Sequence, residues 1–183
     1  MQYSEHYLES VQRNSKFQLD NKTWNGGSTL GYYKEIKALV DKHNAKSLLD
    51  YGCGKALHYK EESPIKFEGQ TFDKFLGIET VFRHDPCVAE YSTLPPAGQK
   101  FDAVIMIQAL GLVPDKDVPW VVELLMEHTE KFCYIGNVDP GKPVKEKKRI
   151  LTQHPGFSSG RDMAWYENQF KNWKGSEIVI SWT

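Results

Sequence analysis

Residues 47–54, with the sequence SLLDYGCG, constrain the fold of this chain more strongly than any other segment. The beginning of the segment is mostly apolar, which is typical of a short strand buried on both faces of a parallel sheet. Gly52 and Gly54 follow on either side of Cys53 and predict a tight turn whose backbone can lie close to a ligand. The segment therefore predicts an α/β fold with a binding site at the end of this strand.

Apolar runs and helical patterns alternate along the rest of the chain. The clearest strand is 102–107, and the clearest helix is 118–131, where apolar residues recur at helical spacing. Strands joined by a helix in this way predict parallel pairing with right-handed crossovers. The last segment alternates in polarity and is the candidate for an antiparallel strand, so we expect a mostly parallel sheet with flanking helices. The other expected elements are helices at 28–44 and 162–173 and strands at Ser47–Tyr51, Thr80–His84, 132–136 and Glu177–Trp182.

The length of 183 residues suits one domain with a substantial core. We expect residues 1–183 to form this domain and 28–183 to be its Rossmann-like part. Residues 1–27 form an aromatic-rich leader that is suited either to cover a ligand as a lid or to pack on the sheet as an ordinary helix. Its aromatic and histidine residues are Tyr3, His6, Tyr7, Phe17 and Trp24.

Composition limits the classes of binding partner and the cellular compartment that we expect for this chain. A net charge of -1, from 23 basic and 24 acidic residues, supplies no global field for nucleic acid. Residues 1–10 are polar and no run of about 18 apolar residues occurs, so we expect a cytoplasmic protein without membrane contact. The three cysteines form no CxxC pair and the histidines are scattered, so we expect reduced thiols and no metal site. The lysine-rich stretch 142–149 is typical of a solvated face.

The glycine turn suits some cofactors better than others. A pyrophosphate-binding turn has the spacing GxGxxG, and its third glycine would fall at position 57, which is Leu57. Dinucleotides are therefore disfavoured. Asp50 at the strand end is suited to hold an ammonium group or ordered water.

Residues 48–54, LLDYGCG, resemble the first motif of the class I S-adenosylmethionine-dependent methyltransferases, and they follow a helix as in that family. The resemblance covers residues 28–136 and is closest to a small branch found among bacteriophage and environmental sequences. It implies S-adenosylmethionine as the cofactor and, for a phage protein, action in the host cytoplasm. The motifs that carry it are DYGCGK at 50–55, DP at 85–86, YS at 91–92 with LP at 94–95, and FDAVI at 101–105.

The family implies roles for the residues of the turn and for a second carboxylate. The backbone of Gly52, Cys53 and Gly54 would lie against the methionine part of the cofactor, with Asp50 near its amino group. Asp85 would accept hydrogen bonds from both ribose hydroxyls, since one carboxylate can serve two donors.

Asp85 lies 31 positions after Gly54 (85 minus 54), later than the roughly 20 of the comparable dinucleotide motif. Glu68 and Asp73 are therefore rivals for the ribose, and Asp85 before Pro86 is also a common turn opener. If Asp85 is correct, the usual second helix and third strand are nearly absent and the sheet is abbreviated.

Other positions are less specific. Tyr91 and Ser92 would flank the adenine by position, although an aromatic residue in a loop is as often part of the core. After the fourth family strand, this chain has QALGLVP at 108–114, where many relatives resemble DVLEHVP, so the acidic and histidine side chains of that motif are missing. We count Gln108 among the cofactor-binding residues. Ala56 also replaces a glycine often seen after the lysine of the turn.

The catalytic residues stay open at this point. The candidates for a proton acceptor are His58, Tyr59, His84 and Tyr91. Methyl transfer from a sulfonium is an in-line displacement that depends on alignment more than on a base. We therefore expect methyl transfer to a small or unidentified acceptor, with nucleobases disfavoured. The alternatives are a lyase or hydrolase that degrades the cofactor and a non-enzymatic binding module.

Overall fold

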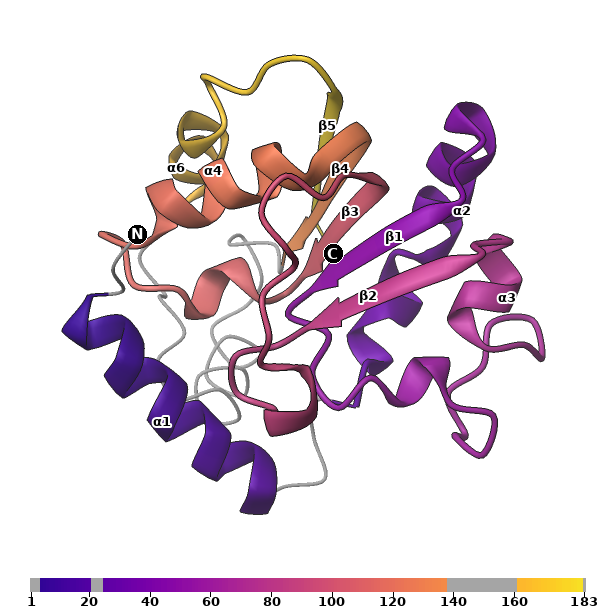
Figure 1. Ribbon diagram of the computed structural model, residues 1–183, viewed down its shortest axis with the longest axis horizontal. Helices are drawn as coiled ribbons and strands as arrows, with labels where there is room; N and C mark the ends of the chain where they lie inside the picture. Colours follow the sequence, from indigo (N-terminus) through magenta and orange to yellow (C-terminus); the bar gives the residue numbers. More distant parts are fainter. Residues whose placement is uncertain (1–3, 21–24, 138–160, 183) are drawn as a thin grey trace.

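The computed structural model describes residues 4–20, 25–137 and 161–182. Its centre is a five-stranded sheet in the order β2-β1-β3-β4-β5, and all neighbouring strands pair in parallel (Figure 1). The strands are β1 Ser47–Tyr51, β2 Thr80–His84, β3 Phe101–Ile107, β4 Thr129–Asn137 and β5 Glu177–Trp182. The predicted α/β, Rossmann-like arrangement is confirmed.

The closing strand corrects one expectation, because β5 pairs with β4 in parallel and is not antiparallel. The connection between these two strands contains α6, Met163–Gln169. A connection of this kind carries the chain back to the opposite end of the sheet, so the next strand runs in the same direction. The alternating polarity of β5 instead reflects an edge strand, whose residues are all partly exposed.

The strand order changes direction at β1. The chain passes from β1 to β2 on one side and then crosses to β3 on the other side of β1. Between β2 and β3, residues 85–100 contain the short 3₁₀-helix η3, Ala89–Tyr91, and no strand. The sheet is therefore abbreviated as predicted, and the carboxyl ends of β1 and β3 form the switch point where open α/β sheets bind ligands.

Helices cover both faces of the sheet. α2, Tyr33–His43, and α3, Phe72–Leu76, cover one face, and α4, Val118–His128, and α6 cover the other (Figure 1). Successive strand residues enter opposite cores, as Leu48 and Leu49 do. Asn44 follows the last residue of α2, and its left-handed φ of 46° matches the predicted stop. The rest of the helix expected at 28–44 is the 3₁₀-helix η1, Gly27–Gly31.

The helix α1, Glu5–Asp20, lies beside the end of the sheet toward which the strands point (Figure 1). Tyr7 is buried in the core and meets the ring of Trp120 edge-on at 5.3 Å. Ser4 fixes the start of the helix, because its Oγ donates to Asp117 Oδ2 over 2.5 Å. α1 therefore packs as an ordinary helix and lies beside the carboxyl end of the sheet.

Some expectations lie outside the described residues, namely the leader residues Tyr3 and Trp24 and the lysine-rich stretch 142–149. Among the helices of the described ranges, none combines the length and the apolar character needed to cross a membrane.

Candidate functional site

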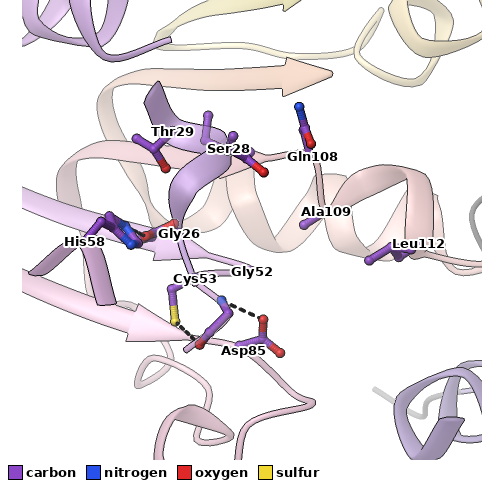
Figure 2. A pocket seen from close by; sticks show the side chains of 13 residues that line it. Gly26, Ser28, Thr29, Gly52, Cys53, His58, Asp85, Gln108, Ala109 and Leu112 are labelled. Carbon is purple, nitrogen blue, oxygen red and sulfur yellow. Dashed lines mark hydrogen bonds and ion pairs between the residues drawn. The ribbon is translucent and has the colours of Figure 1, made fainter. Parts of the chain in front are cut away.

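A cavity lies at the carboxyl ends of β1 and β3, where the strand order changes direction (Figure 2). The position agrees with the general rule for ligand sites in open α/β sheets. Four parts of the chain line it: Gly26, Ser28 and Thr29 before α2; Asp50, Gly52, Cys53, Gly54 and His58 in and after β1; Asp85 after β2; and Ile107, Gln108, Ala109 and Leu112 at and after the end of β3.

The glycine turn after β1 lies in close contact with the end of β2 and with the segment after β3. Gly52 has a φ of +87°, and its N–H donates to His84 O over 2.7 Å. A Cβ atom at Gly52 would lie 2.4 Å from the Cβ of Ala109 and could not be accommodated without movement. Glycine is therefore required here for both its conformation and its size.

Ala56, after the lysine of the turn, has a backbone conformation that favours glycine. Ala56 has a φ of +50°, in the left-handed region that glycine adopts without strain. Its side chain is fully buried against Cys53 and Tyr91. The alanine keeps the turn at some backbone cost and fills a small apolar cluster.

Asp50 is a buried carboxylate, and one of its two oxygens accepts hydrogen bonds within the fold. His58 Nε2 lies 3.1 Å from Asp50 Oδ2, where it donates its hydrogen, and Tyr59 OH donates to the same oxygen over 3.0 Å. Among the described residues, none donates to Oδ1. These two donors hold the carboxylate in place and leave its second oxygen for a cationic group in the cavity.

Asp85 braces the turn from the end of β2. Its Oδ2 accepts the N–H of Gly54 over 2.9 Å (Figure 2). Its Oδ1 accepts the N–H of Cys87 over 2.8 Å. The bond to Cys87 is the turn-opening geometry expected of Asp before Pro, and the bond to Gly54 ties β2 to the glycine turn.

The rivals of Asp85 lie elsewhere. Glu68 is exposed in a tight turn with a φ of +51°, and Asp73 is in the first turn of α3. Neither belongs to the cavity lining, whereas Asp85 does. The structure thus brings Asp50, Gly52, Cys53, Gly54 and Asp85 together, as the sequence predicted.

Of the remaining predicted cofactor-binding residues, one lines the cavity and two do not. Gln108 lines the cavity, with a φ of +52° and its N–H bonded to Gly136 O over 2.7 Å. Tyr91 is buried beside Cys53 and Ala56, with the guanidinium of Arg83 over its ring at 5.3 Å. Ser92 is exposed and donates to Ala89 O. Neither Tyr91 nor Ser92 lines the cavity, so their predicted contact with adenine is not supported by this lining.

The cysteines near the turn are protonated at neutral pH. Burial, and then the charges of Asp50 and Asp85, raise the pKa of Cys53 far above its usual value. Burial and Asp85 raise the pKa of Cys87 to about 12. Since the thiolate is the reactive form, neither cysteine is poised as a nucleophile.

The candidate proton acceptors are also held away from a substrate. Burial raises the pKa of Tyr59 well above its usual value, and so does Asp50. His84 lies outside the lining, with its Nδ1 3.0 Å from Thr93 O, and burial lowers its pKa. His58 is at the cavity, but its Nδ1 lies against Gly26, where a Cβ atom would be 1.7 Å away.

A second cavity shares one wall with the first. The residues common to both are Gly52, Asp85, Ala109 and Leu112. Its other walls are mostly apolar, and α1 forms its cover. The residues that line this cavity but not the first are Tyr7, Ser10, Val11, Asn14, Tyr51, Pro86, Cys87, Met106 and Val113.

Sequence reasoning missed the residues that precede α2 and those of α1. Gly26, Ser28 and Thr29 lie in an asparagine- and glycine-rich run, a turn signal that could have indicated a loop near the site. Ser10 and Asn14 interrupt the inner face of α1 with polar side chains that are buried. Buried polar residues on an otherwise apolar helix face are a second such signal.

No protein-family model, curated protein or solved structure matches this chain. Within the described residues, no group of His, Cys, Asp and Glu side chains is arranged to hold a metal ion.

Proposed function

We propose that this chain binds S-adenosylmethionine across the two cavities and transfers its methyl group to a small acceptor. The observation that carries the proposal is the close approach of Gly52 and Ala109 at the switch point, between one cavity with polar groups and one that is mostly apolar. Such a paired site suits an elongated ligand with a charged amino-acid end and a flat, apolar base. The resemblance of residues 48–54 to the methyltransferase motif supports the same ligand.

The donor set of the first cavity fits the amino-acid end. Asp50 Oδ1 would accept from the ammonium group, because the other oxygen is already held by His58 and Tyr59. The side chain of Gln108 offers both a donor and an acceptor. Asp85, at the wall between the cavities, would accept from the ribose hydroxyls.

When bound, S-adenosylmethionine supplies a methyl group on a positively charged sulfur. The contribution of the chain is to orient the two ends and to exclude water with the loop after β3 and the cover of α1. Tyr59 and His84 are hydrogen-bonded within the fold, and Tyr91 lines neither cavity. The Nδ1 of His58 is buried against Gly26. We therefore expect an acceptor whose nucleophilic atom needs no proton removed by the protein, and a rate that changes little with pH between 6 and 8, the range around the usual histidine pKa of about 6.5.

The test is incubation with labelled S-adenosylmethionine, followed by mass spectrometry of the products, with and without candidate amine, thiol and carboxylate acceptors. Methyl transfer yields S-adenosylhomocysteine only when an acceptor is present. Turnover without an acceptor, to methylthioadenosine or to methionine, would instead favour a lyase or hydrolase. Binding with no turnover would favour a binding module.

A matched pair of glycine variants distinguishes a change at the proposed binding site from the effect of backbone strain alone. Gly52→Ala and Gly69→Ala alter residues with nearly the same φ, +87° and +86°, so both carry similar backbone strain. A Cβ atom at Gly69 has nothing within 4 Å, whereas one at Gly52 meets Ala109. We expect Gly52→Ala to abolish measurable binding and Gly69→Ala to retain it. Equal binding by the two variants would refute the assigned site.

A further inference from the structure

Asn14 has an unusual environment on the inner face of α1. Its side chain lines the second cavity, and the residue is 2% exposed. Within the described residues, its carbonyl Oδ1 is buried and has no hydrogen-bond partner. A buried acceptor without a partner is costly, because it has lost water and gained nothing in exchange. Such an atom is explained if a ligand supplies the missing donor.

Neighbouring groups fix the orientation of the amide. The Nδ2 of Asn14 donates to Ser10 Oγ over 3.3 Å, and Ser10 Oγ in turn donates to Leu112 O over 3.3 Å. Because the hydroxyl hydrogen of Ser10 is used by Leu112, its oxygen can only accept from Asn14. The amide is therefore held with Nδ2 toward Ser10 and with Oδ1 as a fixed acceptor.

The start of α1 is also fixed. Ser4 N donates to Asp117 Oδ1 over 3.2 Å, in addition to the bond from its hydroxyl, and Tyr7 packs against Trp120. Asn14 lies two helical turns farther along the same face, so its amide is presented from an anchored helix. An anchored polar group in an apolar cavity is typical of a specificity contact.

The position of the cavity identifies the part of the ligand that enters it. Asp85, the assigned ribose residue, belongs to both cavities, and Pro86 and Cys87 continue from it into the second one. A group attached to the ribose would therefore enter the mostly apolar space between Met106 and α1. A purine is flat and largely apolar and carries hydrogen-bonding groups at its edge, which suits this space.

We propose that Asn14 reads the adenine base in the second cavity. Oδ1 accepts from the exocyclic amine, and the second hydrogen of Nδ2 is donated to a ring nitrogen, which is the pairing that asparagine makes with adenine in other contexts. Hypoxanthine has a carbonyl in place of this amine, so its oxygen would face Oδ1. The inference rests on the proposed function and names the residue that would select adenine.

The experiment compares the affinities of S-adenosylhomocysteine and S-inosylhomocysteine by isothermal titration calorimetry. With the wild-type chain we expect adenine to be preferred by about 10- to 100-fold, the effect of one or two buried hydrogen bonds gained or lost. Asn14→Leu should weaken S-adenosylhomocysteine by a similar factor and reduce the preference to within about threefold. Gln12→Leu, at an exposed position of the same helix, is the matched control and should change neither value.

Two further measurements test whether Asn14 has only a structural role. Asn14→Leu removes an unpaired buried acceptor and keeps the branching of the side chain, so the melting temperature without ligand should stay the same or rise. Ser10→Ala should free the amide to turn, so that hypoxanthine binds better while adenine still binds.

The outcomes distinguish this inference from the proposed function. If the wild-type chain binds S-adenosylhomocysteine and Asn14→Leu binds it equally well, the inference is wrong and the function stands. Equal affinity of the wild-type chain for the two ligands would also refute it. If the wild-type chain binds neither ligand, both proposals fail.

Discussion

Two buried aspartates, Asp50 and Asp85, each accept at least two hydrogen bonds within the fold. Burying a carboxylate is costly unless it is well hydrogen-bonded. Both residues stand at strand ends, beside cavities, where a ligand with hydroxyl or ammonium donors would add to the bonds that hold them. Their placement is therefore easier to explain by binding than by folding alone.

The ribose assignment can be tested with isosteric changes. Asp85→Asn should weaken S-adenosylhomocysteine binding by about 1.5 to 3 kcal/mol, the usual worth of a hydrogen bond to a charged group. Glu68→Gln and Asp73→Asn, outside the cavity lining, should have little effect. Titration calorimetry measures the affinities, and melting of the free proteins shows how much Asp85 supports the turn. A larger loss of affinity at Glu68 or Asp73 than at Asp85 would move the ribose site.

At the level of elements, the segment between β3 and α4 is the wall of both cavities, and Arg161 holds it. Arg161 is 5% exposed and donates to Leu110 O over 2.9 Å, to Val113 O over 2.5 Å and to Asp115 Oδ1 over 2.8 Å. Its guanidinium also lies 4.3 Å from the ring centre of Trp165. One side chain just before α6 thus positions backbone that lies next to the proposed ligand.

We expect Arg161→Leu to lower the free energy of unfolding by at least about 2 kcal/mol, because two buried carbonyl groups lose a charged donor. It should also weaken S-adenosylhomocysteine binding through movement of the loop. Urea unfolding and calorimetry measure the two effects. Lys116→Leu, an exposed change in the same loop, should alter stability by less than about 0.5 kcal/mol. Unchanged binding by a folded Arg161→Leu protein would show that the loop does not need this anchor.

On the scale of the whole molecule, the sheet is covered on both faces, so its carboxyl end is where the strands leave room for a ligand. α1, the segment around η1 and the loops after β1, β2 and β3 meet there, although they are far apart in sequence. A ligand in this position would contact several segments that are brought together only by folding. Binding should therefore be strongly coupled to folding.

Thermal melting tests this coupling. S-adenosylmethionine at a hundredfold excess over its dissociation constant should stabilise the protein by about 2.7 kcal/mol, provided that it binds only the folded state. NAD should give no shift, because the turn has Leu57 where a pyrophosphate-binding turn has its third glycine. A shift with NAD and none with S-adenosylmethionine would contradict the assignment of the glycine turn.

Local patterns were enough to predict much of the fold and several residues that line the first cavity. The strands at Ser47–Tyr51 and Thr80–His84 have the predicted bounds, because glycine and proline end their apolar runs. Parallel strands end at the same edge of a sheet, so Asp50, Asp85 and Gln108 could be expected to meet there. These features depend on neighbours in the sequence and on one topological rule.

Other features depend on contacts between distant segments, which no local pattern encodes. The direction of β5 follows from the path of the chain around α6, and alternating polarity cannot distinguish an antiparallel strand from a parallel edge strand. Tyr91 is buried beside Ala56 because the short connection between β2 and β3 packs against the glycine turn. Asn14 and Thr29 belong to the cavities because α1 and η1 pack at the strand ends, and the burial of a polar side chain is decided by what covers it.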